Sequence, residues 1–264
     1  MLTVSPALEL VKVTQRFRAP GRVYSGFTAI EQLSFDLAKG EFVSIVGPSG
    51  CGKSTILNLV AGLDRPSEGV VKLGGNPVNG PSPQVGFMLQ KDLLLPWRTI
   101  LHNVEFGLET RPMATAARRE RALDELKRCR LSDFAGHYPH QLSGGQRQRA
   151  ALARTLAIKP DVVLLDEPFS SLDAQTKLIL QRSFAETIAR SGVTTLLITH
   201  DLFEAVLMSD RILVMSEQPG RIIEEIEVGL PDRDKPMARR CLPRALEIAS
   251  HLFNVLRLYE RIDA

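Results

Sequence analysis

The chain contains few cysteines and little net charge. Its three cysteines, Cys51, Cys129 and Cys241, are widely spaced and odd in number. They therefore predict neither a disulfide framework nor a metal-binding cluster, and they favour a reducing compartment. The formal net charge of +3 is too small to indicate a surface that binds nucleic acid.

Long apolar runs are also absent. No stretch approaches the roughly 20 apolar residues that cross a bilayer, and residues 1–10 lack the basic start and apolar core of a secretion signal. If the protein works at a membrane, we expect it to do so through a partner. The 264 residues, 44% hydrophobic and 24% charged, are typical of a soluble globular protein with one large α/β domain or two small ones.

A glycine-rich segment between two apolar runs is the most informative stretch of the chain. Residues 42–46 predict a strand, residues 56–61 predict a helix, and the segment between them matches the phosphate-loop pattern GxxxxGK[ST]. Glycines allow backbone N–H groups to converge on an anion, and the N-terminus of the next helix attracts negative charge. We expect Lys53 to reach the β- and γ-phosphates of a nucleotide and the Ser54 hydroxyl to bind Mg²⁺. The predicted loop consists of Gly47, Pro48, Ser49, Gly50, Cys51, Gly52, Lys53, Ser54 and Thr55.

Alternating strand and helix patterns extend over most of the chain. Residues 8–13 and 33–37 alternate apolar and polar side chains, as half-buried strands do, and the proline- and glycine-containing segment 16–26 predicts a loop between them. A charged, helix-forming block at 99–130 interrupts this pattern. The order of elements predicts a mainly parallel sheet with an inserted helical subdomain at about 91–142.

Two helices are predicted from the spacing of their apolar residues. The helix at 114–130 is expected to bury Ala122, Leu123, Leu126 and Cys129. We divide the chain into a main body, residues 1–230, and a C-terminal tail, residues 231–264. The tail is expected to end in a helix that packs on the main body through Leu246, Ala249, Phe253 and Leu256.

Two carboxylates follow the continuous apolar run at 162–165. Such a run predicts a buried strand, and α/β sheets bind ligands at the carboxyl ends of their strands. We expect Asp166 to hold Mg²⁺, directly or through water, and Glu167 to accept a proton from an attacking water molecule. The alternative is an ordinary strand that ends in two surface acids, and the phosphate loop favours the first interpretation.

A second helix start able to accept an anion is predicted at Ser143. Ser143 is a favourable N-cap residue, and Gly144 and Gly145 leave the first turn without side chains. The basic residues that follow, Arg147, Arg149 and Arg154, are interpreted as helix surface rather than as a nucleic-acid patch.

These segments together resemble the ATP-binding subunit of ABC transporters. The phosphate loop, Gln90, LSGGQ at 142–146, LLDEP at 164–168, SLD at 171–173 and THD at 199–201 follow one another in the family's order and spacing over about residues 8–228. The resemblance implies an ABC ATPase cassette with a mainly parallel core sheet, an N-terminal antiparallel β subdomain and an inserted helical subdomain. It also implies ATP and Mg²⁺ as ligands.

The resemblance further implies a homodimer with two ATP molecules between its subunits. Gln90 is expected to contact Mg²⁺, to take part in hydrolysis and to report the nucleotide state to the helical subdomain. His200 is expected to touch the γ-phosphate beside Glu167, and Asp173 to bridge the dimer. The residues expected at the γ-phosphate of the opposite subunit's ATP are Ser143, Gly144 and Gly145, followed by Gln146.

Two side chains of the site are predicted less directly. Members of this family stack an aromatic residue on adenine, and Phe17 occupies the matching place, with Tyr24 as the alternative. Either ring could instead belong to the core. Cys51 lies two residues before Lys53 and close to a helix N-terminus, so we expect a lowered thiol pKa and protection of the thiol by bound ATP.

A closer resemblance, to the nitrate/sulfonate/taurine import group, is carried by LPWRT at 95–99, NV at 103–104, SDRI at 209–212 and PGRI at 219–222. It implies a peripheral subunit at the cytoplasmic face of the cell membrane. Its partners are then a membrane permease and, indirectly, an extracytoplasmic solute-binding protein. Trp97, the only tryptophan, lies where such subunits receive the permease, although a core tryptophan is the alternative.

Other functions within the family stay open at this point. An exporter cassette is one alternative, and a soluble ABC ATPase of translation or repair is another. Against the second, the chain has one cassette rather than two and no sustained heptads. The transported solute is not readable from this sequence.

Overall fold

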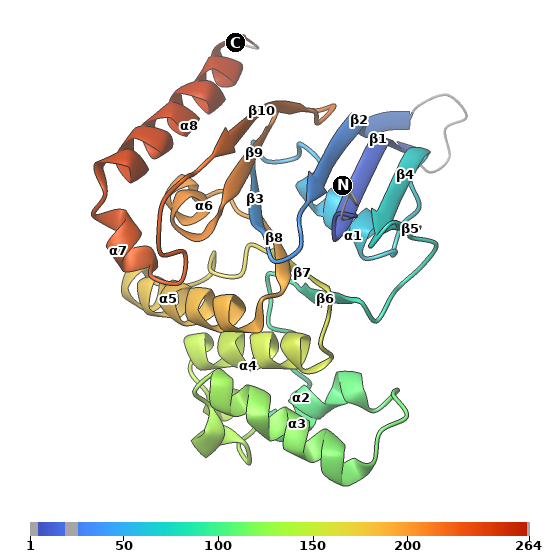
Figure 1. The fold of residues 1–264 in the computed structure, drawn as a ribbon, viewed down its shortest axis with the longest axis vertical. Coiled ribbons are helices and arrows are strands. Elements are labelled where there is room, and N and C mark those ends of the chain that lie inside the picture. The colour runs from blue at the N-terminus through green and yellow to red at the C-terminus, as the bar shows by residue number, and fades with distance from the viewer. Residues whose placement is uncertain (1–4, 19–25, 263–264) are drawn as a thin grey trace.

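The computed structural model describes residues 5–18 and 26–262, and the elements fall into three regions (Figure 1). A six-stranded sheet occupies the centre, a small antiparallel sheet lies at one side of it, and a group of helices lies at one end of the molecule. The C-terminal helices run along the side opposite the small sheet.

The central sheet places the phosphate loop at the middle of the molecule. Its strand order is β10-β9-β3-β8-β7-β6, and every neighbouring pair is parallel except β10 with β9. All five residues of β3 are buried, as expected for a continuous apolar run between two other strands. The strands are β10 (Ile222–Glu227), β9 (Arg211–Met215), β3 (Phe42–Val46), β8 (Thr194–Ile198), β7 (Val162–Asp166) and β6 (Val85–Met88).

The small sheet has the order β2-β1-β4-β5 with antiparallel pairing throughout. Its strands are β1 (Leu8–Arg18), β2 (Gly26–Leu37), β4 (Glu68–Leu73) and β5 (Asn76–Pro77). β1 and β2 are longer than the strands predicted at 8–13 and 33–37, and part of the predicted loop is strand. Register shifts in β1 break the apolar alternation, so the pairing of Phe17 with Phe27 was not visible as a strand pattern.

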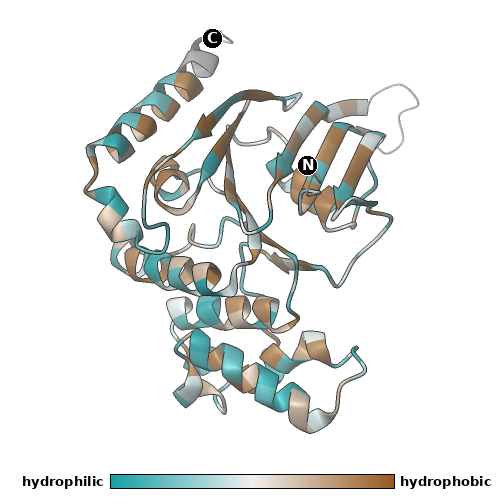
Figure 2. Ribbon diagram, in the orientation of Figure 1, coloured by the Kyte–Doolittle hydropathy of each residue, from teal (hydrophilic) through white to brown (hydrophobic). Residues whose placement is uncertain are grey.

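The helices at the end of the molecule pack on one another across one apolar core. They are α2 (Ile100–Glu105), η1 (Phe106–Leu108), α3 (Thr115–Arg128), η2 (Ser132–Phe134), η3 (Pro139–Gln141) and α4 (Gly144–Ala157). On α3, Ala122, Leu126 and the C-cap Cys129 are fully buried, but Leu123 is 40% exposed. The predicted face was therefore wrong at Leu123. Most of α3 is hydrophilic (Figure 2), and only Ala122, Glu125 and Leu126 are buried within the helix.

Helices on both faces complete the core around the central sheet. α1 (Lys53–Val60) packs between the two sheets, whereas α4 and α5 (Ala174–Ser191) share a second apolar cluster with the other face. α6 (Leu202–Met208) belongs to a third cluster with β9 and the C-terminal helix. This arrangement gives the predicted α/β fold with helices on both faces of a mainly parallel sheet.

The C-terminal residues form α7 (Pro236–Arg240) and α8 (Pro243–Ile262). Two members of the predicted packing stripe are wrong, because Leu246 and Phe253 are 61% and 48% exposed. The fully or nearly fully buried positions are instead Ala245, Ile248, Ala249 and Leu252. Both stripes have helical spacing, so the sequence alone did not distinguish the face that meets β9 and α6.

Arg239 joins the C-terminal segment to the main body through hydrogen bonds. Its side chain is 2% exposed, and its guanidinium donates to four backbone carbonyl groups. Burial lowers the pKa of this guanidinium from its usual value. The acceptors are the oxygens of Leu207, Ser209, Leu230 and Pro231.

Candidate nucleotide site

The phosphate loop turns directly from β3 into α1. Gly52 is the N-cap of α1, with φ of 95°, a left-handed conformation that favours glycine. A Cβ atom on Gly52 would also lie 2.5 Å from Cγ2 of Ile30. No side chain caps this helix start, so its first N–H groups are available to an anion.

The side chain of Lys53 folds back over the preceding residues of the loop. Its Nζ atom donates to the carbonyl oxygens of Gly47 and Pro48, both at 2.7 Å. The loop and the small sheet enclose a cavity of about 360 Å³, within the size range of small-ligand sites. The cavity is lined by Phe17, Phe27, Ala29, Ser49, Gly50, Gly52, Lys53, Ser54, Thr55 and Glu167.

Cys51 points away from this cavity into the core. It is 1% exposed, and burial raises the pKa of its thiol, an effect that the positive charge of Lys53 opposes but does not cancel. The prediction of a lowered pKa was therefore wrong, because desolvation exceeds the attraction of Lys53. Behind the loop, Gly220 approaches so closely that a Cβ atom there would lie 2.0 Å from the Cys51 carbonyl oxygen.

The carboxyl ends of β7 and β8 bring Glu167 and His200 together. Nδ1 of His200 lies 3.1 Å from Oε2 of Glu167. The backbone of Glu167 has φ of 45°, an uncommon conformation for a residue other than glycine, and its N–H donates to the oxygen of Ile198. Strained backbone of this kind is concentrated at functional sites.

Oxygen donors suited to Mg²⁺ gather at the same end of the sheet. Burial and the neighbouring charge of Glu167 raise the pKa of Asp166, and Lys53 opposes this rise. Two adjacent carboxylates whose repulsion raises a pKa fit a divalent cation that binds oxygen ligands. The Ser54 hydroxyl lines the phosphate-loop cavity, and Gln90 donates from Nε2 to Oγ of Ser170, which in turn donates to the Glu167 carbonyl oxygen.

α4 holds the segment that follows Gln90. Gln148 donates to the Gln90 carbonyl oxygen at 3.2 Å, Arg147 pairs with Asp92 at 3.1 Å, and Arg154 donates to the carbonyl oxygens of Asp92 and Leu93 at 2.7 Å. Arg147 and Arg154 are therefore partly exposed residues of the helix surface that also bind this segment. The sequence offered no signal for these partners, which are more than 50 residues away.

Ser143 and Asp173, both exposed, cap the starts of α4 and α5. Oγ of Ser143 accepts from the N–H of Gln146, whose own side chain accepts from the N–H of Ser143. Oδ1 of Asp173 accepts from the N–H of Thr176. Hydrogen bonding to the side chain of Thr176, and then to its N–H, lowers the pKa of Asp173. The two starts are neighbours, because a Cβ atom on Gly145 would lie 3.0 Å from Cγ2 of Thr176. Neither start lines the phosphate-loop cavity.

Two aromatic rings border the phosphate-loop cavity. Phe17 and Phe27 have ring centroids 5.5 Å apart, and Phe27 is 53% exposed. The sequence analysis did not predict Phe27 as a residue of this site. The pairing of Phe27 with Phe17 across β1 and β2 is the feature that could have indicated it. The alternative residue, Tyr24, lies outside the described residues.

Trp97 lies on the surface beyond Gln90. Its side chain is 72% exposed, so the interpretation as a core tryptophan was wrong. Leu93, in the same segment, is 53% exposed. An exposed tryptophan with a nearby leucine is a feature of surfaces that bind other proteins.

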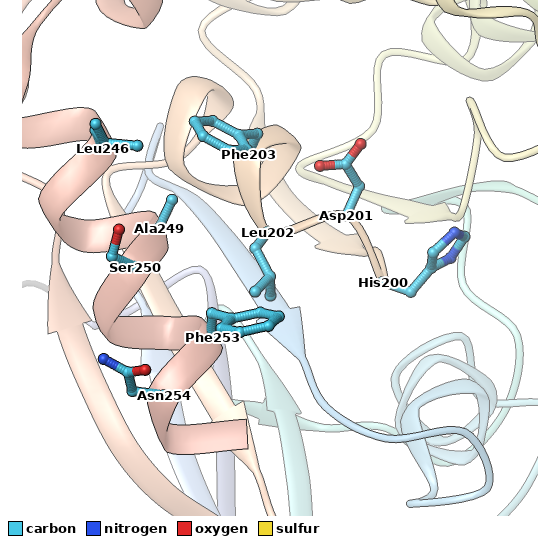
Figure 3. A pocket seen from close by; sticks show the side chains of 9 residues that line it. All are labelled: His200, Asp201, Leu202, Phe203, Leu246, Ala249, Ser250, Phe253 and Asn254. Atoms are coloured by element: carbon cyan, nitrogen blue, oxygen red, sulfur yellow. The ribbon is translucent and has the colours of Figure 1, made fainter. Parts of the chain in front are cut away.

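A larger hollow lies on the other side of His200, between α6 and α8 (Figure 3). Its volume is about 690 Å³, and Leu202 and Phe203 of α6 face Leu246 and Phe253 of α8 across it. His200 and Asp201 stand at its edge. The phosphate-loop cavity, at about 360 Å³, is smaller than this hollow and shares no lining residue with it.

Comparison with known proteins identifies the family. The family model described as "ABC transporter" matches residues 30–170, slightly more than half of the chain. The chain belongs to the ABC transporter family. As an ATP-binding subunit of this family, it hydrolyses ATP. Within residues 5–18 and 26–262, no helix has the length and apolar character to cross a membrane.

Similar proteins cover most of this ABC subunit. A putative ATP-binding protein of Brucella abortus is 46% identical over 79% of this chain and 80% of its own length. The taurine import ATP-binding protein TauB of Yersinia pestis is 44% identical over 80% of this chain and 82% of its own. A solved dimer of the ATP-binding cassette MJ0796, bound to ADP and Pi, is 35% identical with a TM-score of 0.71 and covers 84% of this chain and 98% of its own.

Proposed function

We propose that this ABC subunit powers the import of a small anionic solute, of the nitrate, sulfonate or taurine kind, across the cell membrane. The observation that carries this proposal is the 44% identity to a taurine import ATP-binding protein over 80% of the chain. The LPWRT segment supports it, because Trp97 is exposed, as is Leu93 two residues before the segment. They form a surface suited to a permease.

The chemistry follows from the residues at the strand ends. Lys53 binds the β- and γ-phosphates, and Glu167 accepts a proton from the water that attacks the γ-phosphorus, so that ADP leaves and inorganic phosphate forms. His200, whose Nδ1 lies 3.1 Å from Oε2 of Glu167, touches the γ-phosphate beside that carboxylate. Ser54, Gln90 and Asp166 would hold Mg²⁺, which supplies neutralisation of phosphate charge when bound.

The second half of each ATP site comes from another copy of the chain. The cap residues of α4 and α5, Ser143 and Asp173, are exposed, and neither helix start lines the phosphate-loop cavity of its own chain. A helix start with bare N–H groups attracts phosphate. Ser143, Gly144, Gly145 and Gln146 therefore bind the γ-phosphate held by the partner copy, and Asp173 lies at the dimer contact.

The dimer also contacts adenine and the permease. Phe17, with Phe27 beside it, stacks on adenine at the edge of the cavity. The dimer binds two permease subunits at the cytoplasmic face of the membrane, and a solute-binding protein delivers the solute from the other side. Hydrolysis separates the two copies, and the segment from Gln90 to Trp97 transmits this motion to the permease.

Solute uptake in the native host tests the proposal. Cells lacking the gene should lose uptake of labelled taurine, an alkanesulfonate or nitrate, and the wild-type gene should restore it. Trp97→Ala should fail to restore uptake although the purified protein binds MgATP and keeps its melting temperature. Glu167→Gln is the inactive control. Unchanged uptake of all three solutes in the deletion strain would contradict the importer proposal.

A further inference from the structure

A partly buried ion cluster joins α5 to the turn that carries His200. Nζ of Lys177, on α5, lies 2.7 Å from Oδ2 of Asp201 and 3.1 Å from Oε2 of Glu204. Glu204, on α6, is 2% exposed. Nε2 of Gln181, one turn after Lys177, lies 3.5 Å from the same Glu204 oxygen. A cavity of about 180 Å³, also bordered by Arg240 of α7, adjoins these groups.

Asp201 uses its two carboxylate oxygens for different purposes. Oδ1 accepts from the N–H of Glu204 and so caps the start of α6, whereas Oδ2 accepts from Lys177. The N–H of Asp201 donates to Oγ1 of Thr199. The backbone on both sides of His200 is therefore held by hydrogen bonds, and Lys177 is the member that comes from another helix.

The charges of the cluster support a permanent ion pair. Burial lowers the pKa of Lys177, but its hydrogen bond to Asp201 and the charge of Glu204 outweigh this, and the pKa is raised overall. Burial raises the pKa of Asp201, but the hydrogen bond from Lys177 outweighs it, and the pKa is lowered overall. Lys177 therefore stays protonated and Asp201 ionised at neutral pH.

We infer that Lys177 is a positioning residue for hydrolysis, which holds the His200 turn against α5 through Asp201. This inference rests on the proposed role of His200 at the γ-phosphate. Lys177 lies one turn after Asp173, and its N–H donates to the Asp173 carbonyl oxygen. The exposed start of α5 and the His200 turn thus move together. A contact of the partner copy at Asp173 is thereby linked to the placement of His200.

Kinetics of the full-length chain give the first test. Lys177→Met should lower kcat by about 10- to 100-fold, the scale expected when a positioned catalytic group shifts. The KM for MgATP should change little, because Lys177 does not line the phosphate-loop cavity. Lys177→Arg should restore much of kcat, since arginine can bind both carboxylates. Lys72→Met is the matched control, because Lys72 forms a single ion pair with Glu9 on the small sheet, and it should leave kcat unchanged.

A second variant covers the case in which Lys177→Met does not fold. Asp201→Ser keeps an N-cap acceptor for α6 and leaves Lys177 paired with Glu204, but it removes the Lys177–Asp201 bond. It should lower kcat as Lys177→Met does. Wild-type kcat in both well-folded variants would overturn the inference.

The histidine ring signals separate positioning from simple stability. In ¹⁵N–¹H spectra, the ring resonances of His200, assigned with His200→Ala, should shift in Lys177→Met and in Asp201→Ser but not in Lys72→Met. Unchanged ring resonances of His200 in both variants would overturn the inference even if the melting temperature falls. Failure of the proposed function looks different, because His200→Ala itself would then hydrolyse ATP at the wild-type rate.

Discussion

The phosphate-loop cavity and the starts of α4 and α5 differ in how completely one chain surrounds them. Around the cavity, Lys53 bonds to its own loop, and His200 contacts Glu167. At the helix starts, Ser143 and Asp173 are exposed, and their side chains bond only to the first turn that follows. One chain forms the whole pocket around the phosphate-loop cavity, which we call the closed region. We call the starts of α4 and α5 the open region, because in the proposed dimer they bind a phosphate that another copy of the chain holds.

The difference explains why one chain is expected to bind ATP but not to hydrolyse it efficiently. Binding needs the loop, Lys53 and the cavity wall. In the proposed dimer, donors from both regions stabilise the charge on the γ-phosphate during hydrolysis. The two regions can therefore be disabled separately, the first by Glu167→Gln and the second by Ser143→Arg.

Glu167→Gln disables the closed region without changing its shape. Removing a general base should lower kcat by about 10²- to 10⁴-fold while MgATP still binds. Single-turnover ATPase assays and nucleotide-binding titrations measure the two quantities. A kcat within a factor of two of the wild type would remove Glu167 from this role.

Ser143→Arg disables only the open region. In the Glu167→Gln background, ATP should produce a dimer in sedimentation velocity experiments, and adding Ser143→Arg should abolish it. Binding of MgATP to the monomer should persist, because Ser143 does not line the phosphate-loop cavity. An ATP-dependent dimer that survives Ser143→Arg would contradict the proposed composite site.

Glu204→Gln removes a buried carboxyl group from α6. Burial raises the pKa of Glu204 to about 7, against an ordinary 4.5, although Lys177 opposes the rise. The folded protein thus holds this proton more tightly than the unfolded chain, so the wild type should lose stability as pH rises from about 4.5 through 7. Each pKa unit corresponds to about 1.4 kcal/mol.

Chemical denaturation at several pH values measures this loss. In Glu204→Gln it should be smaller, while the stability of an Asp232→Asn control, on an exposed surface pair, should follow the wild type. Identical pH profiles for wild type and Glu204→Gln would show that Glu204 does not titrate in this range.

The smallest effect is expected at the thiols. Burial raises the pKa values of both Cys51 and Cys129, the latter to about 12, whereas Cys241 is exposed. A maleimide should therefore label Cys241 first and the other two only after unfolding. Peptide mapping after timed labelling, with and without MgATP, measures the order. Rapid labelling of Cys51 that ATP suppresses would restore the earlier interpretation of a reactive loop thiol.

Local patterns allowed most of the central fold to be predicted from the sequence. The strand at 42–46 and the helix after the glycine-rich loop depend on neighbours in the chain. Both are present in the structure, as β3 and α1. Ser143 was likewise expected as an N-cap, and it is one. The roles of Glu167, Gln90 and Asp173 stay predictions, because they concern ligands and a partner copy.

The features that the sequence did not reveal depend on distant segments. Whether Cys51 is reactive depends on how deeply the loop is covered, and Leu246 or Ile248 can equally begin a helical stripe. The hydrogen bond from Lys177 to Asp201 spans 24 residues, and those from Arg154 span more than 60. Periodicity carries no information about such pairs, since it records only which face of one element is apolar.

The hydrogen bonds of Arg239 bear on how the chain unfolds. Its guanidinium occupies the carbonyl oxygens of Leu207 and Ser209 at the end of α6 as well as those of Leu230 and Pro231. A chain cut before Arg239 would leave these acceptors without their donor, and buried carbonyl groups without a donor are costly. The C-terminal helices and the main body should therefore melt in one cooperative transition, and a shortened chain should melt earlier rather than simply lose a separate part.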